Sequence, residues 1–104
     1  MNEYRLVVVT TPDEEEGMRI ARKLVEKELA ACVNVVPKMR SVYRWKGEVV
    51  EDTEALLLIK TRTKLLAKVE RRVKKMHSYE VPEFLIFKID GGSDDYLKWL
   101  GTAI

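Results

Sequence analysis

The spacing of apolar residues changes along the chain, and each change predicts a structural element. Residues 4–10, YRLVVVT, are apolar and β-branched without strict alternation, which predicts a strand buried on both faces. Thr11 as N-cap and Pro12 at the first helical position predict a helix from Pro12 to about Leu29. Five apolar residues recur at helical spacing within it: Met18, Ala21, Leu24, Val25 and Leu29.

Residues 31–61 are predicted to form a long extended hairpin. The first half, residues 31–46, is rich in valine and aromatic residues and is interrupted by Pro37, which only an edge strand accepts without losing a ladder hydrogen bond. Lys46 and Gly47 are predicted to form a turn, and the residues from 48 onward are predicted to form a third strand. We therefore expect a bent edge strand followed by a continuous one.

The last third of the chain returns to a helical period and then to a strand. A second helix is expected from Thr63 to near His77, a fourth strand over residues 82–89, and a short helix after a cap at Ser93 or Asp94. The order is βαββαβ plus a C-terminal helix. This order predicts the α+β class with a ferredoxin-like split βαβ arrangement, an antiparallel sheet, and one domain over residues 1–104.

Both faces of this predicted sheet carry apolar side chains. Two helices cover only one face of a four-stranded sheet, so the other face needs a different cover. Self-association through that face is the simplest solution, and Tyr43 and Trp45 on the hairpin would supply aromatic interface anchors. The sequence therefore predicts a homo-oligomer.

The composition narrows the class of protein. The 104 residues include 19 Lys and Arg against 17 Asp and Glu, mixed along the chain, which argues against a nucleic-acid partner. One cysteine makes no internal disulfide, no apolar run approaches a membrane span, and the first residues lack a signal pattern, so we expect a cytoplasmic protein without a membrane partner. A charged fraction of 35% with no glutamine suggests a thermophilic source.

Several blocks of the sequence resemble one known family. LAACVNVVP, SVYRWKGEVVEDTE, LLIKT, HSYEVPE and DYLKWL are similar, in this order, to blocks of the CutA (CutA1) divalent cation tolerance proteins. The resemblance implies a ferredoxin-like homotrimer whose long hairpin reaches a neighbouring subunit, an architecture shared with PII signalling proteins. It also implies a link to divalent cations, notably copper, and no catalytic activity.

The segment MHSYEVPEFLIF holds the only histidine, His77, close to Glu80 and Glu83. Imidazole and carboxylate groups are ligands for copper and other divalent cations. A histidine at the end of a helix can equally bind the last helical carbonyls. We predict a structural corner first and a weak divalent-cation site second. Cys32 lies in a strand, where a free cysteine is usually a small buried group, with metal ligation or redox chemistry as the alternative.

The resemblance also shows where this chain departs from its relatives. The copper ligands proposed for bacterial members are a cysteine at the end of the first strand and two adjacent histidines. The matching positions here are Thr10, Met76 and His77, so only His77 is kept, although a methionine thioether can bind Cu(I). The alternative function is a PII-like signalling or interaction trimer that binds a small molecule between subunits.

Two other classes with this topology are disfavoured by the residues themselves. Acylphosphatase-like enzymes bind phosphate in a loop after the first strand, whereas TTPDEEE is acidic and lacks glycine. RNA-recognition modules need exposed aromatic residues on the central strands, and LLLIK has none.

Overall fold

The computed structural model describes residues 3–104. Its elements are, in chain order, β1 (Tyr4–Thr11), α1 (Glu14–Glu26), β2 (Cys32–Trp45), β3 (Glu48–Arg62), a 3₁₀ turn (Thr63–Leu65), α2 (Leu66–Met76), β4 (Leu85–Lys88) and α3 (Asp94–Ala103). The strands form one antiparallel sheet in the order β2-β3-β1-β4. This arrangement confirms the predicted α+β class and the ferredoxin-like order, and it places β3 and β1 in the centre of the sheet.

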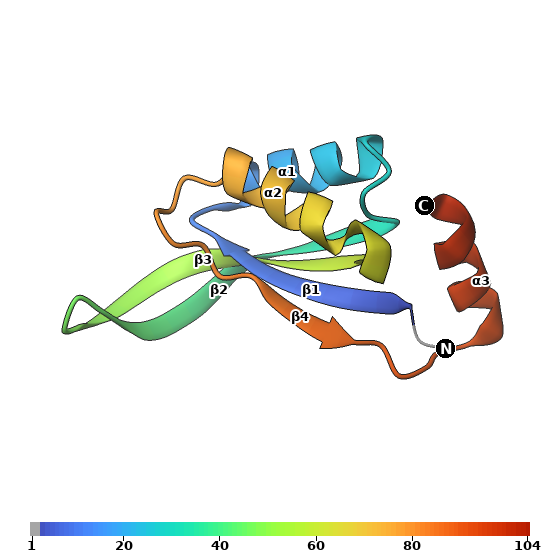
Figure 1. Ribbon diagram of the computed structural model, residues 1–104. Helices are drawn as coiled ribbons and strands as arrows, with labels where there is room; N and C mark the ends of the chain where they lie inside the picture. Colours follow the sequence, from blue (N-terminus) through green and yellow to red (C-terminus); the bar gives the residue numbers. More distant parts are fainter. Residues whose placement is uncertain (1–2) are drawn as a thin grey trace.

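The core lies between the sheet and one layer of two helices (Figure 1). Along β3, Ala55, Leu57, Ile59 and Thr61 are fully buried, because alternate residues of a strand point to the same face. Residues of β1, of both helices and of the loop after α1 complete this core: Val7, Val9, Ile20, Leu24, Ala30, Val69 and Val73. The third helix, α3, stands apart at the end of the sheet where the chain begins (Figure 1).

Both ends of the first predicted helix are corrected by the structure. Thr11 ends β1, and its hydroxyl donates to the Asp13 carbonyl oxygen at 2.8 Å. Asp13 is the N-cap instead, since its carboxylate accepts from the Glu16 backbone N–H at 2.8 Å. The helix stops at Glu26 rather than near Leu29, because Glu28 takes a left-handed conformation with φ 57°.

The hairpin follows the sequence prediction closely. Lys46 and Gly47 form its turn with φ values of 50° and 81°, the positive φ angles that a two-residue turn of this kind needs. The predicted interruption at Pro37 is a bulge between Val36 and Met39 in the edge strand β2. The paired strands extend well beyond the rest of the sheet as an arm (Figure 1).

The fourth strand is shorter than predicted. It begins at Leu85 rather than at Pro82 and pairs with β1 through four residues only, from Leu85 opposite Val8 to Lys88 opposite Arg5. Pro82 has no backbone N–H for a ladder and lies in the irregular segment before the strand. The second helix begins with a 3₁₀ turn at Thr63, and Ser93 caps α3 by accepting from the Tyr96 N–H.

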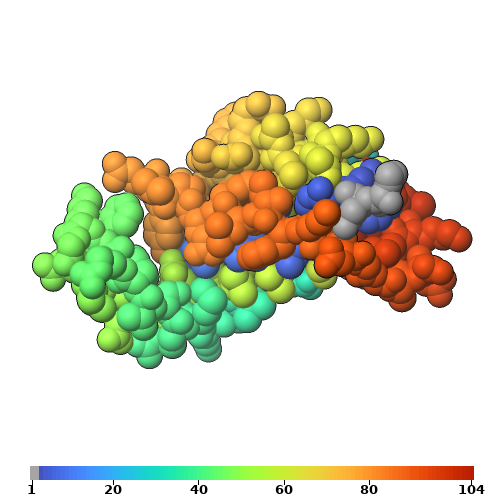
Figure 2. Space-filling model, turned by 60° about the horizontal axis from the view of Figure 1, so that its bottom comes forward, coloured from blue at the N-terminus to red at the C-terminus, as the bar shows by residue number. Residues whose placement is uncertain are grey.

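We call the side of the sheet away from α1 and α2 the open face. Its position follows from strand alternation, since Val7 and Val9 face the helices and their neighbours point the other way. Six apolar residues of three strands lie on it: Leu6, Val8, Leu56, Leu58, Leu85 and Phe87. Figure 2 brings this side forward and shows β4 and parts of β1 at the surface without a helix over them. Leu85 and Phe87 are 49% and 46% exposed.

Candidate functional site

The residues after α2 form a corner in which His77 is held by two hydrogen bonds. Its side chain is fully buried. Nε2 lies 2.7 Å from the Thr10 carbonyl oxygen of β1, and the Tyr79 backbone N–H donates to Nδ1 at 3.0 Å. A carbonyl oxygen only accepts, so Nε2 carries the hydrogen and Nδ1 provides a lone pair. Both ring nitrogens are therefore used in binding the corner to the fold.

Two buried glutamates hold the same corner from other elements. Glu16 of α1 accepts a hydrogen bond from the Ser78 backbone N–H at 2.9 Å. Glu54 of β3 accepts one from the Tyr79 hydroxyl at 2.6 Å. Burial, followed by this hydrogen bond, raises the pKa of Tyr79, so the phenol stays a donor. The corner is thus tied to β1, α1 and β3, which makes it a structural junction.

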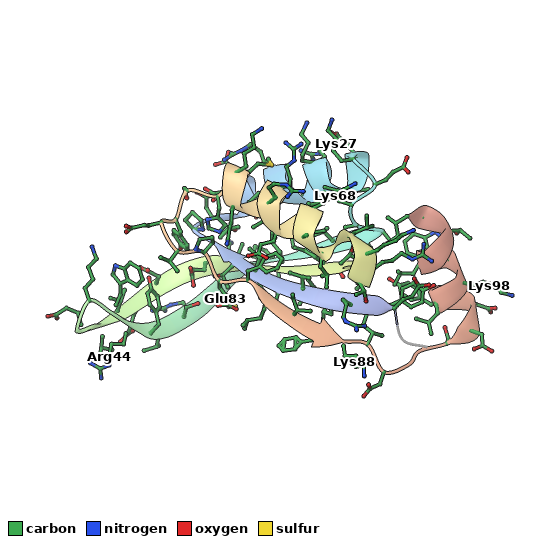
Figure 3. The ribbon with its side chains drawn as sticks, in the orientation of Figure 1. Lys27, Arg44, Lys68, Glu83, Lys88 and Lys98 are labelled. Atoms are coloured by element: carbon green, nitrogen blue, oxygen red, sulfur yellow. The ribbon has the colours of Figure 1, made fainter. Side chains whose placement is uncertain are left out.

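A cavity of about 650 Å³ lies between this corner and the base of the hairpin. We call it the acidic cleft. It is lined by Thr10, Ser41, Val42, Tyr43, Trp45, Glu54, Ser78, Tyr79, Glu80, Val81 and Glu83. Burial and then the nearby Glu54 carboxylate raise the pKa of Glu83. Figure 3 shows Glu83 beside the base of the hairpin. A carboxylate whose charge is disfavoured by a neighbouring one gains stability when a cation binds beside it.

The hairpin supplies the aromatic wall of the acidic cleft. The Tyr43 hydroxyl donates to Oδ2 of Asp52 on the neighbouring strand, and this hydrogen bond is the main reason that the pKa of Tyr43 rises to about 12. Trp45 remains 42% exposed, with Nζ of Lys46 5.9 Å from its ring centroid. The two rings therefore offer apolar surface both to the cleft and to the outside.

The structure brings some of the predicted site residues together and separates others. Glu80 and Glu83 line the acidic cleft with Tyr43 and Trp45, whereas His77 lies behind its wall. Met76 packs against the core.

Cys32 is not among the residues that line the cleft. It is half-buried on β2, opposite Lys60, with its Sγ 3.8 Å from Lys60 Nζ. Within residues 3–104 no three His, Cys, Asp or Glu side chains are grouped so that they could hold a metal ion.

Sequence reasoning missed the two glutamates that build the junction, although each left a signal. Glu54 lies on the same face of β3 as Leu56 and Leu58, because alternate residues of a strand share a face. A carboxylate therefore occupies a position where this alternation predicts an apolar residue. Glu16 stands four residues before the buried Ile20, on the buried side of α1. A charged residue on an apolar stripe points to a buried partner, but the sequence does not show which one.

Nearly the whole chain matches one family model, CutA1 divalent ion tolerance protein, over residues 5–103. The chain belongs to the CutA1 family. The divalent-cation tolerance protein CutA of Thermus thermophilus is 53% identical over 95 residues, which are 91% of this chain and 92% of that relative. The chloroplastic CutA of Arabidopsis thaliana is 50% identical over 94% of this chain, and the match spans 54% of that longer relative. These matches confirm the family resemblance.

Solved CutA1 structures share the fold. The Thermus thermophilus Cut A1 structure superposes with a TM-score of 0.90 at 52% identity, covering 93% of this chain and 94% of that one. CutA1 from Oryza sativa gives a TM-score of 0.94 at 45% identity, covering 98% and 94%. No helix within residues 3–104 is long and apolar enough to cross a membrane. Other CutA proteins are described as chloroplastic or periplasmic, so the cytoplasmic location stays a prediction.

Proposed function

We propose that the chain assembles as a homotrimer and binds a divalent cation, copper among them, in the acidic cleft, without acting as an enzyme. The observation that carries the metal part is that Glu54, Glu80 and Glu83 line one cleft; partial desolvation and then Glu54 also raise the pKa of Glu83. A divalent cation between these carboxylates would remove their repulsion. The Thermus thermophilus relative is named a divalent-cation tolerance protein, which agrees with this proposal.

The donor set suits weak binding of a divalent cation. Glu83, Glu80 and Glu54 line the cleft without forming a group of three ligands, so each offers a carboxylate oxygen only to a weakly held ion, and Glu54 keeps one oxygen beyond the one that accepts from Tyr79. Oxygen ligands suit hard and borderline divalent ions, whereas tight copper sites use imidazole or sulfur. His77 could bind a metal through Nδ1 only by giving up the Tyr79 N–H hydrogen bond. In this proposal the imidazole therefore positions the cleft wall, and Cys32 remains a separate candidate outside it.

The trimer part rests on the open face. Its apolar residues are only partly buried by this chain, and an exposed apolar surface of this kind marks a contact with another protein. A second and third copy of the chain are the simplest cover, since closed symmetric assemblies bury the same patch on every subunit. The extended arm with Tyr43 and Trp45 would then reach a neighbouring subunit and place the acidic cleft at a subunit boundary.

Copper titration of the demetallated protein tests the metal proposal. Glu83→Gln removes one cleft charge and should weaken copper binding by about tenfold, the equivalent of about 1.4 kcal/mol. Glu48→Gln, at the exposed tip of the arm, removes the same formal charge outside the cleft and should leave the affinity unchanged. If Glu83→Gln binds copper as the parent does and His77→Asn does not bind it, the copper ligand is the His77 imidazole and not the cleft carboxylates.

A second candidate function follows from the aromatic wall of the same cleft. A volume of about 650 Å³ lies in the range of small-molecule sites, and Tyr43 and Trp45 face the carboxylates across it. Aromatic faces and carboxylates together suit an organic cation, such as an amine with an apolar body. This is the PII-like alternative, in which a trimer senses a small molecule. Thermal-shift measurements with amines and with copper separate the two, because each stabilises only a protein that binds it.

A further inference from the structure

A groove lined almost entirely by cations runs along the helix layer. It has a volume of about 360 Å³ and lies between the end of α1 and the exposed side of α2. We call it the basic groove; it is lined by Lys27, Leu29, Lys68, Arg71, Arg72 and Lys75. No acidic side chain is among these lining residues. Figure 3 shows Lys27 and Lys68 on the helix layer, with Lys27 pointing away from the sheet.

Folding creates this concentration of charge. Residues 18–28, which leave out the three glutamates in the first turn of α1, carry four cations and two carboxylates, and residues 63–76 carry six cations and one carboxylate. The two segments together have an excess of seven positive charges, although the formal net charge of the chain is +2. The rest of the chain therefore has an excess of five negative charges. The charges are mixed in the sequence but separated in space, because the sheet order brings α1 and α2 side by side.

The cations of the basic groove have no protein partner within residues 3–104. Two nearby carboxylates are paired with other lysines, Glu70 with Lys74 at 2.8 Å and Glu26 with Lys23 at 3.8 Å. None of the five lining cations uses its side chain in a hydrogen bond or an ion pair there. Like charges on adjacent helical turns repel each other, so the groove is a place where a bound anion would stabilise the fold.

We propose that the basic groove binds a compact polyvalent anion made of linked phosphate groups. Arginine forms paired hydrogen bonds to phosphate oxygens, and lysine supplies a point charge on a flexible stem. Leu29 is the one apolar residue lining the groove, and no aromatic ring is present to stack a base. The groove therefore recognises the phosphate chain itself rather than a nucleoside. This site is independent of the acidic cleft and of the metal proposal.

The test is calorimetric titration of the full chain with inorganic tripolyphosphate at low salt. We expect one binding event per chain, an affinity that falls as salt is added, and a rise in melting temperature. The double variant Lys68→Gln, Arg71→Gln should weaken binding about tenfold or more, since two charge-assisted contacts are lost. The control Lys88→Gln, Lys98→Gln removes the same formal charge from β4 and α3, away from the groove (Figure 3), and should bind as the parent does.

The outcomes distinguish the possible sources of the phosphate chain. If ATP binds as tightly as tripolyphosphate and AMP binds much more weakly, the groove recognises linked phosphates whether they are free or attached to a nucleoside. Absence of tripolyphosphate binding, or equal weakening in both double variants, overturns the proposal, because the effect would then come from overall charge. Duplex DNA that binds more tightly than tripolyphosphate and loses affinity in the groove variant also overturns it, since the groove would then be a nucleic-acid surface.

Discussion

Replacement of His77 tests whether the corner after α2 is a structural junction. His77→Ala leaves the Thr10 carbonyl and the Tyr79 N–H without their partners, at 2.7 and 3.0 Å in the native fold. Each unsatisfied buried group costs about 1–3 kcal/mol. The fully buried ring also leaves a cavity. We therefore expect the free energy of unfolding to fall by about 3–5 kcal/mol, a large effect for one substitution.

Two conservative variants separate the two hydrogen bonds. The side-chain oxygen of asparagine lies near the Nδ1 position and can accept from the Tyr79 N–H, whereas the amide of glutamine reaches the Nε2 position and can donate to Thr10. Each variant keeps one bond, so His77→Asn and His77→Gln should each recover about 1–2 kcal/mol of the loss seen in alanine.

Urea unfolding at one fixed protein concentration is the measurement, because subunit assembly makes the midpoint depend on concentration. Light scattering on each variant before unfolding shows whether assembly has changed. A loss below about 1 kcal/mol in His77→Ala, or no difference among the three variants, would refute the hydrogen-bond reasoning. Copper affinity measured on the same samples shows separately whether the imidazole is a ligand.

The other predictions concern charge, turn geometry and assembly. The pKa of Glu83 is higher in the folded protein than in the unfolded chain, where it is about 4.5. The contribution of Glu83 to the free energy of unfolding is therefore fully present below the unfolded pKa and is lost as pH rises through the folded pKa. Glu83→Gln should therefore raise the urea midpoint at pH 7, and a gain that persists below pH 4 would contradict this assignment. Gly47 has φ 81° with open space around it, so Gly47→Ala should cost about 1 kcal/mol of stability, and no loss would show that the turn relaxes. Light scattering should give about three times the 12.1 kDa chain mass, and Phe87→Lys on the open face should lower it. Val25→Lys changes a similarly exposed residue of α1 and should leave the mass unchanged. Equal effects of Phe87→Lys and Val25→Lys on the mass would contradict the proposed trimer.

The sequence by itself determined the elements and their order. Its apolar period distinguished strands from helices, and β3 alternates buried and half-buried residues from Ala55 to Arg62, as a strand with apolar side chains on both faces should. The turn at Lys46 and Gly47 followed from local backbone preference, which acts over a few residues. Errors fell at the ends of elements, as at Asp13 and Pro82, where one local signal competes with another.

Only the tertiary structure decided which side chains meet. The hydrogen bonds of His77 to Thr10 and of Tyr79 to Glu54 join residues 67 and 25 positions apart, and no period in the sequence encodes such a pair. The basic groove has partly the same origin, because Lys27, in the turn after α1, comes beside the four lining cations of α2 only when both helices pack on one face of the sheet. Periodicity reports which face of its own element a residue occupies, whereas a site depends on distances between elements, and packing sets those distances.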